Sequence, residues 1–264
     1  VILYAAQLYA DFSGGIDICR GIAEIMGIKM AENFKRPYFS KTLTEYWHRW
    51  HVSLGDWLRN YLFYPISISK SFLKMSKSMK KHGMKYFGKV FPTALASLIT
   101  FIVIGFWNGI VIMISSLMKP LTDKLTEKLH IKRENFFYSV FCMVRTFIVV
   151  LIGYYFDIAR GFKDAVNMIW RSVADFHISE LAAFDCLAKS KIDIFDYLII
   201  FVGCLVIFAV SLVQEKKKDS VRKLLCEKST VLQWILYILM IVAIALFGYY
   251  GPGTTPADFV YMQF

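Results

Sequence analysis

The sequence lacks the cysteine spacing of metal sites and of disulfide-stapled proteins. Its five cysteines form no paired metal-ligand pattern, and several lie in apolar stretches as small apolar residues. The internal repeats from which many transporters are built are also missing. A zinc site, a disulfide framework and a transporter are therefore not favoured.

The beginning of the sequence lacks the parts of a secretory signal peptide. Val1 opens an apolar segment that has neither a positively charged flank nor a small-residue cleavage site. There is no initial methionine either. We therefore expect the sequence to begin partway through a longer protein.

Apolar side chains are abundant: 57% of the residues are hydrophobic and 17% are aromatic, with a mean hydropathy of +0.48. Several stretches approach the roughly 20 residues that a helix needs to cross a bilayer. The clearest are 136–159, 194–213 and 231–250, and 92–118 is a longer run with almost no charge. The prediction is an all-α, multi-spanning transmembrane helical bundle in the cell membrane, with the lipid bilayer around it.

Charged residues interrupt the apolar opening segment, 1–27. They are Asp11, Asp17, Arg20 and Glu24. Because charges in membrane helices usually face the interior of a bundle, this segment is expected to pack among other helices.

A single arginine, Arg145, lies within the predicted span 136–159. A charge in hydrocarbon is costly unless it faces a partner or a water-filled cavity, so Arg145 is expected to point into the bundle. Structural pairing with Asp11 or Asp17 and contact with a substrate are both open.

The net charge of +11 comes from basic residues in the segments between the apolar spans. Lysine and arginine in such loops normally set the orientation of a membrane protein, so nucleic-acid binding is not favoured. The segment 69–91 carries seven lysines and is predicted to be a basic cytoplasmic loop.

Counts of lysine and arginine test how often the run 92–118 crosses the membrane. With one crossing, twelve basic residues fall outside and eleven inside, which leaves no bias. If the run enters and returns, eighteen fall inside and five outside. About 26 residues are too many for one untilted span and too few for two. We therefore expect a shortened return.

Aromatic and titratable residues concentrate in 44–64, TEYWHRWHVSLGDWLRNYLFY. One interpretation is an amphipathic helix at the membrane interface, where aromatic rings anchor and arginine reaches phosphate. The other is that a histidine among aromatic rings acts as a general base on a hydroxyl. His48 and His51 compete for that role; a metal site is not favoured because no third ligand is near. The candidate substrate-binding residues are Trp47, Trp50, Arg59, Asp11, Asp17 and Arg145.

The first 65 residues resemble the membrane-bound O-acyltransferase (MBOAT) family, in its alginate O-acetyltransferase and teichoic acid D-alanyltransferase branch. The chain contains YADFSGGID, ENFKRPY and WHRWHVSLGDWLRNY, which are similar to the family's Y-x-D-F-S-G-x-x-D, E-N-F-x-x-P-Y and W-x-R-W-H-x-S-L-x-x-W-x-R-x-Y elements. The ending, YYGPGTTPADFVYMQF, resembles the family's usual ending. The resemblance identifies His51 with the functionally important histidine of R-W-H-x-S, which makes it the candidate catalytic residue.

The resemblance also implies a division of the chain. Residues 1–264 are expected to form the C-terminal portion of one MBOAT-like domain. Within it, 1–65 is the signature region, 69–91 the basic loop, 92–250 the transmembrane helices with their loops, and 251–264 the tail.

A second histidine of the family, in G-x-W-H-G, is missing from this chain. Gly105, Phe106 and Trp107 are followed by Asn108. Loss of a segment at the Trp107–Asn108 junction explains the missing histidine, the shortened apolar run and the disturbed charge balance together. A substitution of histidine by asparagine explains only the first, so loss of a segment is favoured.

The resemblance implies transfer of an acyl group across the membrane. The donor, acetyl-CoA or an acyl-carrier protein thioester, arrives from the cytoplasmic side as a substrate, and no cofactor is expected. The acceptor is a hydroxyl on a cell-envelope polysaccharide or on an extracytoplasmic acetyltransferase partner. His51 is expected to orient the acceptor or the second histidine, while Trp47, Trp50 and Arg59 shape the site.

Acetyl transfer is favoured over D-alanyl transfer, because EYWHRWHVSLGDWLRNYLFYPI is closer to the alginate-type motif. The rival hypothesis is a non-catalytic membrane scaffold of a polysaccharide-modification system. The missing histidine is its main support.

Overall fold

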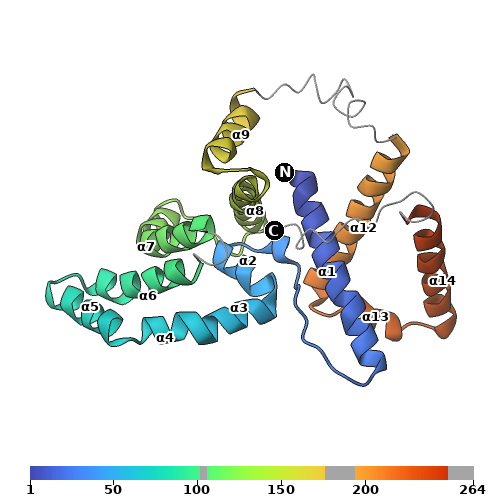
Figure 1. Ribbon diagram of the computed structural model, residues 1–264, viewed down its shortest axis with the longest axis horizontal. Coiled ribbons are helices and arrows are strands. Elements are labelled where there is room, and N and C mark those ends of the chain that lie inside the picture. The colour runs from blue at the N-terminus through green and yellow to red at the C-terminus, as the bar shows by residue number, and fades with distance from the viewer. Residues whose placement is uncertain (102–105, 176–193, 249–264) are drawn as a thin grey trace. The chain divides into compact units, whose positions relative to one another are not determined.

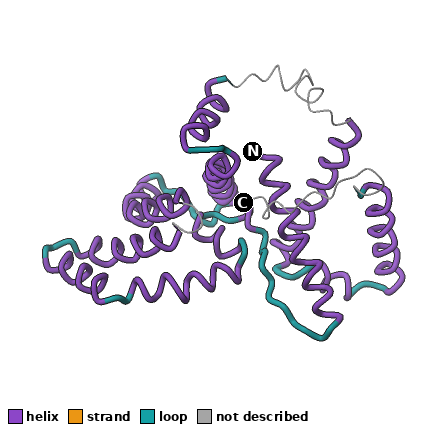
Figure 2. The backbone as a smooth tube through the Cα atoms, in the orientation of Figure 1, coloured by secondary structure: helices purple, strands orange, loops and turns teal. Residues whose placement is uncertain are grey.

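The computed structural model describes residues 1–101, 106–175 and 194–248, and its regular elements are helices (Figures 1 and 2). The chain divides into two compact units, Val1–Arg171 and Ser172–Phe264. In the first unit the elements are α1 (Ile2–Ile25), η1 (Pro37–Phe39), α2 (Leu43–Arg49), α3 (Val52–Leu58), η2 (Arg59–Phe63), α4 (Tyr64–Ser67), α5 (Lys70–Lys81), α6 (Lys85–Phe101), α7 (Phe106–Lys128), α8 (Phe136–Ile158) and α9 (Phe162–Ala174), which ends just beyond the boundary. In the second they are α12 (Ile194–Lys217), α13 (Val221–Cys226) and α14 (Thr230–Phe247).

Three helices have the length and composition of membrane spans. They are Phe136–Ile158, Phe195–Lys217 and Thr230–Phe247, with 23, 23 and 18 residues. At about 1.5 Å per residue the shortest covers about 27 Å, close to the thickness of the hydrocarbon core. The three spans predicted most clearly from the sequence thus fall on helices long and apolar enough to cross a bilayer, and the protein is an all-α membrane protein.

Polar caps fix where two of these helices begin. The Asn135 side chain accepts a hydrogen bond from Phe137 N at the start of α8, and Ser229 accepts one from Leu232 N at the start of α14. These caps satisfy backbone N–H groups that have no partner within the first turn. Each apolar run therefore starts directly after a polar residue.

One face of α8 packs against the signature region. Its buried residues, Cys142, Thr146, Val150 and Tyr154, are spaced by four and lie along one side of the helix. This side meets α1, η1, α2 and α7. The helix α8 therefore supports the segment that carries the sequence motifs.

The segment 69–91, predicted to be a loop, is helical instead. Ser69 caps α5, and α6 begins at Lys85. The apolar residues Phe72, Met75 and Met79 recur at helical spacing, so the many lysines occupy the other face of a helix. The lysines alone predict a loop, whereas the 3.6-residue spacing of the apolar residues predicts the helix that is observed.

The described parts of the run, 92–101 and 106–118, lie in two helices that return on each other, the arrangement that the charge counts favoured. The Tyr86 hydroxyl near the start of α6 donates to the carbonyl of Ser116, well along α7, at 3.0 Å. The two helices are therefore antiparallel neighbours, and α5 packs along α6 (Figure 1). The 17 residues of α6 reach about 25 Å, which is shorter than a full crossing.

Some predicted features lie outside the described residues. Gly105 of the apolar run and the family-like ending, 249–264, are among them. The same holds for Lys189 and Lys191, which were counted among the outside charges.

Candidate functional site

The candidate site is built around the junction between α2 and α3, where His51 lies. An extended segment after α1 runs antiparallel to this junction: Lys35 N donates to Arg49 O at 2.9 Å, and Val52 N donates to Asn33 O at 3.0 Å. Between these bonds Phe34 forms a bridge with Trp50. His51 has φ 45° and ψ 61°, a left-handed conformation that is uncommon outside glycine, although histidine, asparagine and aspartate adopt it more often than other residues. The flanking backbone bonds hold it there.

Asn33 joins two of the sequence motifs. Its side chain is buried, and its Oδ1 accepts a hydrogen bond from Ser53 N at 2.9 Å, in the first turn of α3. The ENF element therefore caps the helix that starts in the RWHVS element, from 20 residues away. Asn33 was not predicted as a site residue; the available signal was an asparagine within a family-like motif, because asparagine is a preferred helix-capping residue.

Aromatic rings enclose one side of His51. The Phe12 ring of α1 meets the imidazole edge to face, with the centroids 4.9 Å apart, and Phe34 lies at 6.4 Å. Behind them Trp50 is buried and stacks on Tyr46 at 5.7 Å. Burial lowers the pKa of His51 below its ordinary value of 6.5, so the imidazole is neutral at pH 7.

The hydrogen bonding of His51 fixes which ring nitrogen carries the proton. Nδ1 accepts a long hydrogen bond from Leu54 N at 3.4 Å. A neutral imidazole that accepts through Nδ1 carries its proton on Nε2. Nε2 is therefore a donor, suited to hold an acceptor or carbonyl oxygen, whereas a general base would need an unprotonated nitrogen facing the hydroxyl.

Three tyrosines connect the signature region to α8. The Tyr38 hydroxyl donates to Ala5 O at 2.7 Å, so it can only accept from Tyr154, which lies 3.3 Å away. Tyr154 then accepts from Tyr46 at 2.9 Å. Burial raises the pKa of Tyr38 well above its ordinary range, with the neighbouring Tyr154 adding to the effect. The phenol therefore stays protonated and remains a donor. This chain was not predicted from the sequence.

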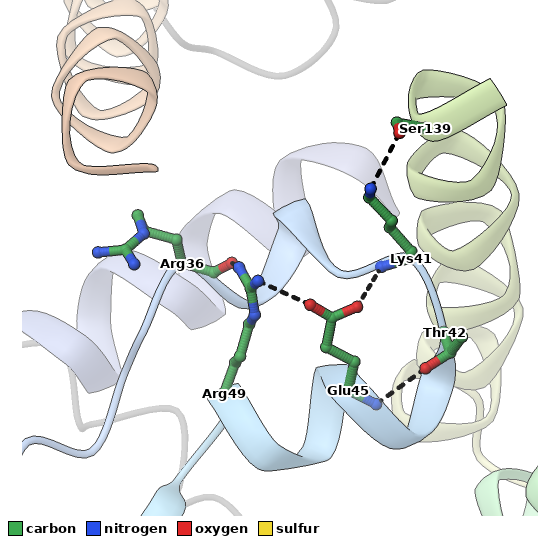
Figure 3. Close-up of polar contacts among 6 residues, drawn as sticks. All are labelled: Arg36, Lys41, Thr42, Glu45, Arg49 and Ser139. Carbon is green, nitrogen blue, oxygen red and sulfur yellow. Dashed lines mark hydrogen bonds and ion pairs between the residues drawn. The ribbon is translucent and has the colours of Figure 1, made fainter. Parts of the chain in front are cut away.

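A polar network fixes the entry into α2 (Figure 3). Thr42 caps the helix by accepting from Glu45 N at 3.1 Å, and Glu45 in turn accepts from Lys41 N at 2.8 Å. The other oxygen of Glu45 pairs with Arg49 at 2.7 Å. The Lys41 ammonium donates to Ser139 Oγ of α8 at 2.9 Å. These reciprocal bonds form a capping box in which the glutamate accepts from the residue before the N-cap, Lys41, and not from the N-cap itself.

Arg145 does not point into the bundle, contrary to the expectation. It is exposed, and its guanidinium donates to the carbonyl of Lys41 at 2.9 Å. The packed face of α8 includes Thr146, and a neighbouring position is turned by about 100° from it. Asp17, one of the suggested partners, instead pairs with Arg20 at 2.9 Å. Arg145 therefore ties α8 to the start of α2.

The other predicted site residues are distributed as follows. Trp50 adjoins His51 in the buried aromatic cluster, and Trp47 lies in α2, half-buried. Arg59 begins the π-helical turn η2 and pairs with Asp56 at 2.6 Å. Asp11 is half-buried in α1, and the competing His48 is exposed. The structure thus brings Trp50 together with His51, and gives Arg59 and Asp17 partners of their own.

The Trp107–Asn108 pair lies at the start of α7 against α8. Trp107 Nε1 donates to Val149 O at 3.1 Å, and its ring stacks on Phe156 with centroids 5.9 Å apart. Gly153 leaves room for this ring, since a Cβ there would lie 3.2 Å from Trp107 Cδ1. The peptide after Trp107 is an ordinary part of the helix Phe106–Lys128. Across the part of the chain that the structure describes, no group of three His, Cys, Asp or Glu side chains could hold a metal ion.

Curated relatives support the resemblance in the motifs, although no family profile matches the chain. The chain is 30% identical to the probable alginate O-acetylase AlgI of Pseudomonas syringae over 191 residues, 68% of this chain and 32% of the relative. It is 28% identical to the teichoic acid D-alanyltransferase of Bacillus subtilis over 169 residues, 60% of this chain and 40% of the relative. With the peptidoglycan O-acetyltransferase of Helicobacter pylori it shares 41% identity over 63 residues, 24% of this chain and 12% of the relative.

These similarities define a class of membrane acyl-transfer proteins. The chain belongs to the membrane-bound O-acyltransferase family, and its relatives include both the alginate and the teichoic acid branches. It spans about a third of the length of the alginate relative and two fifths of the teichoic acid relative.

Proposed function

We propose that the protein is a multi-pass plasma-membrane O-acyltransferase that moves an acyl group, most simply acetyl, onto a hydroxyl of a cell-envelope polysaccharide. The proposal rests on the turn at His51, which contacts from several parts of the signature region hold in place. A left-handed histidine is held by two backbone bonds and by Asn33, and its ring lies against Phe12. Strained residues held in this way concentrate at functional sites.

The proposed chemistry is acyl transfer from a thioester. The acceptor hydroxyl oxygen forms a bond to the acyl carbon, the carbon–sulfur bond breaks, and the hydroxyl proton ends on the leaving thiol. His51, with its proton on Nε2, donates to an oxygen of the acceptor or of the thioester carbonyl, which orients it and offsets developing negative charge. The donor is acetyl-CoA or an acyl-carrier thioester, which follows from the family and not from a contact in this chain.

The scaffold hypothesis rests on the missing second family histidine, since Asn108 follows Trp107 here. If the unmodified protein transfers no acyl group, the variant Asn108→His separates two explanations. It stays inactive when a segment has been lost at this point, because the surrounding residues are missing, and it gains activity when a single residue has changed. The two explanations of the missing histidine are therefore separated by one substitution.

The test is transfer of radiolabelled acetyl in membrane vesicles that contain the full chain. The donors offered are acetyl-CoA and acetylated acyl-carrier protein, and the acceptor probe is alginate. Ester-linked label, released by mild base, is expected with the unmodified protein and is expected to fall about 10²-fold or more in His51→Gln. The matched control is His48→Gln, three residues away and exposed, which keeps the activity. No transfer from either donor by the unmodified protein favours the scaffold.

A further inference from the structure

The helix α5 has one face packed against α6. Phe72, Met75, Ser76 and Met79 are its half-buried residues, at helical spacing. Ser76 Oγ donates to Gly88 O at 2.5 Å, and a Cβ on Gly88 would lie 2.7 Å from Lys80 Cγ. The close approach of the two helices fixes which side of α5 faces outward.

The outward side of α5 carries a stripe of lysines. Lys70, Lys74, Lys77 and Lys81 are separated by four, three and four residues, and all are exposed. At about 100° per residue these four positions fall within an arc of about 60°, opposite the packed face. Along the axis they extend over about 16 Å. The lysine stripe is thus a linear row of cations and is longer than one small anion.

No acidic residue of the surrounding sequence balances the lysine stripe. The chain has no aspartate or glutamate between Asp56 and Asp123. None of the four lysines belongs to an ion pair within the described ranges, whereas Arg59 and Lys223 each pair with an aspartate. The positive charge of the stripe is therefore available to an anionic surface outside this part of the chain.

Exposed aromatic and apolar side chains lie close to the lysine stripe in the sequence. Trp57 and Tyr61 precede it with 51% and 66% exposure, and Ile68 at 66% and Leu73 at 49% adjoin it. Tryptophan and tyrosine beside lysine are enriched where proteins meet the boundary of a bilayer. An acidic protein partner would account for the lysines but not for these rings.

The antiparallel pair α6 and α7 places further basic residues at the same end. The bond from Tyr86 to Ser116 sets the start of α6 beside the last part of the apolar run in α7. Lys85, Lys89 and Lys119 follow at that end. The excess of basic residues predicted for the cytoplasmic side when the run returns therefore gathers near α5.

We propose that α5 is an interfacial helix whose lysine stripe binds the phosphate headgroups of anionic phospholipids in the cytoplasmic leaflet. The stripe spans several headgroups, and the flanking Trp57, Tyr61 and Ile68 enter the boundary between headgroups and acyl chains. Binding is electrostatic, so it weakens as salt is added. This proposal is independent of the acyl-transfer activity.

The test is amide hydrogen exchange of α5 in the full chain, reconstituted in lipid nanodiscs. Discs of phosphatidylcholine alone are compared with discs that contain about 30 mol % phosphatidylglycerol. Exchange in 70–81 is expected to slow about fivefold in the anionic discs, and about 0.5 M sodium chloride is expected to reverse this. Exchange in α8 serves as the internal check that the protein is folded.

Two four-residue variants distinguish the lysine stripe from overall charge. Changing the four lysines of the stripe to glutamine is expected to abolish the slowed exchange in anionic discs. Changing the same four to arginine is expected to keep it. The four are Lys70, Lys74, Lys77 and Lys81. The charge-matched control changes four exposed lysines outside α5 to glutamine and keeps the effect; they are Lys124, Lys128, Lys132 and Lys163.

Three results overturn the proposal. Equal exchange in both kinds of disc shows that anionic lipid is not the occupant. If both glutamine variants lose the slowing of exchange by phosphatidylglycerol to the same extent, only net charge matters. Slowed exchange in neutral discs on addition of purified acyl-carrier protein, without any response to phosphatidylglycerol, assigns the stripe to an acidic protein.

Discussion

At the residue scale, the groups around His51 determine the protonation state and the tautomer of its side chain. Its backbone conformation is held by the segment that contains Asn33, and its ring is partly shielded by Phe12. The shielding favours the neutral imidazole, and the bond from Leu54 N directs the proton to Nε2. Of the two roles that the sequence left open for His51, general base and orienting group, this arrangement favours the orienting group, which donates through Nε2.

Reaction with diethyl pyrocarbonate measures the lowered pKa of His51, because only the neutral imidazole reacts. Since burial lowers this pKa, half-maximal reaction of His51 is expected below pH 6.5, the ordinary value. A peptide with the sequence around His51 is the reference, and mass spectrometry locates the adduct. A midpoint at or above that of the peptide contradicts the burial argument.

The same shift predicts a pH dependence of stability. The unfolded chain takes up the proton first, so the folded state loses stability as the pH falls through about 6.5, and the loss is complete below the folded pKa. The variant His51→Gln is expected to lose this part of the slope in thermal unfolding between pH 5 and 8.

Removal of the Asn33 side chain is predicted to destabilise the turn that holds His51. In Asn33→Ala the Ser53 N–H loses its acceptor in the first turn of α3, which costs roughly 1–2 kcal/mol. The measurement is unfolding in detergent by denaturant or heat. Asn60→Ala is the control, because Asn60 is exposed, and it is expected to change stability little. Equal effects of the two variants would count against the cap.

At the scale of the element, contact between helices depends on small residues and on the phase of each helix. Gly153 admits the Trp107 ring onto α8, and Gly88 admits α5 onto α6. In α8 the phase decides that Thr146 is packed while Arg145 reaches outward to Lys41. Of two adjacent positions on this helix, one therefore packs in the core and the other reaches the backbone of a different segment.

Filling the space at Gly153 is predicted to separate α7 from α8. A Cβ at this position is already 3.2 Å from Trp107, so Gly153→Leu displaces the ring and its bond to Val149, at a cost of about 1–3 kcal/mol. A lowered unfolding temperature is the expected readout. Gly203→Leu in α12 is the matched control, since no atom lies within 4 Å of a Cβ there. If both variants unfold alike, the Trp107 contact contributes nothing measurable.

At the scale of the whole molecule, the returning pair α6 and α7 predicts on which side of the membrane particular residues lie. Single cysteines at Ser78 and Lys163, in a background without other cysteines, report their side through an impermeant thiol reagent in intact cells. Ser78→Cys is expected to be protected and Lys163→Cys to be labelled, because the basic segments around α5 lie inside. Labelling of both positions, or the reverse pattern, contradicts the return.

The sequence by itself determined the long apolar helices and the class of the protein. Runs such as 136–159 could be predicted because about 20 apolar residues can satisfy their backbone in a bilayer only as a helix. The motifs around His51 could likewise be recognised from the sequence alone. A helical period in 70–81 was present as well, but the lysine content concealed it.

Only the tertiary structure decided which of these residues meet. Asn33 caps a helix that starts 19 residues later, and Tyr46 bonds to Tyr154, 108 residues away. Arg145 donates to a backbone carbonyl, whereas the sequence suggested a carboxylate partner. Helix formation depends on neighbours a few positions apart, whereas these contacts depend on how helices pack and on the phase of each one, which local sequence does not record.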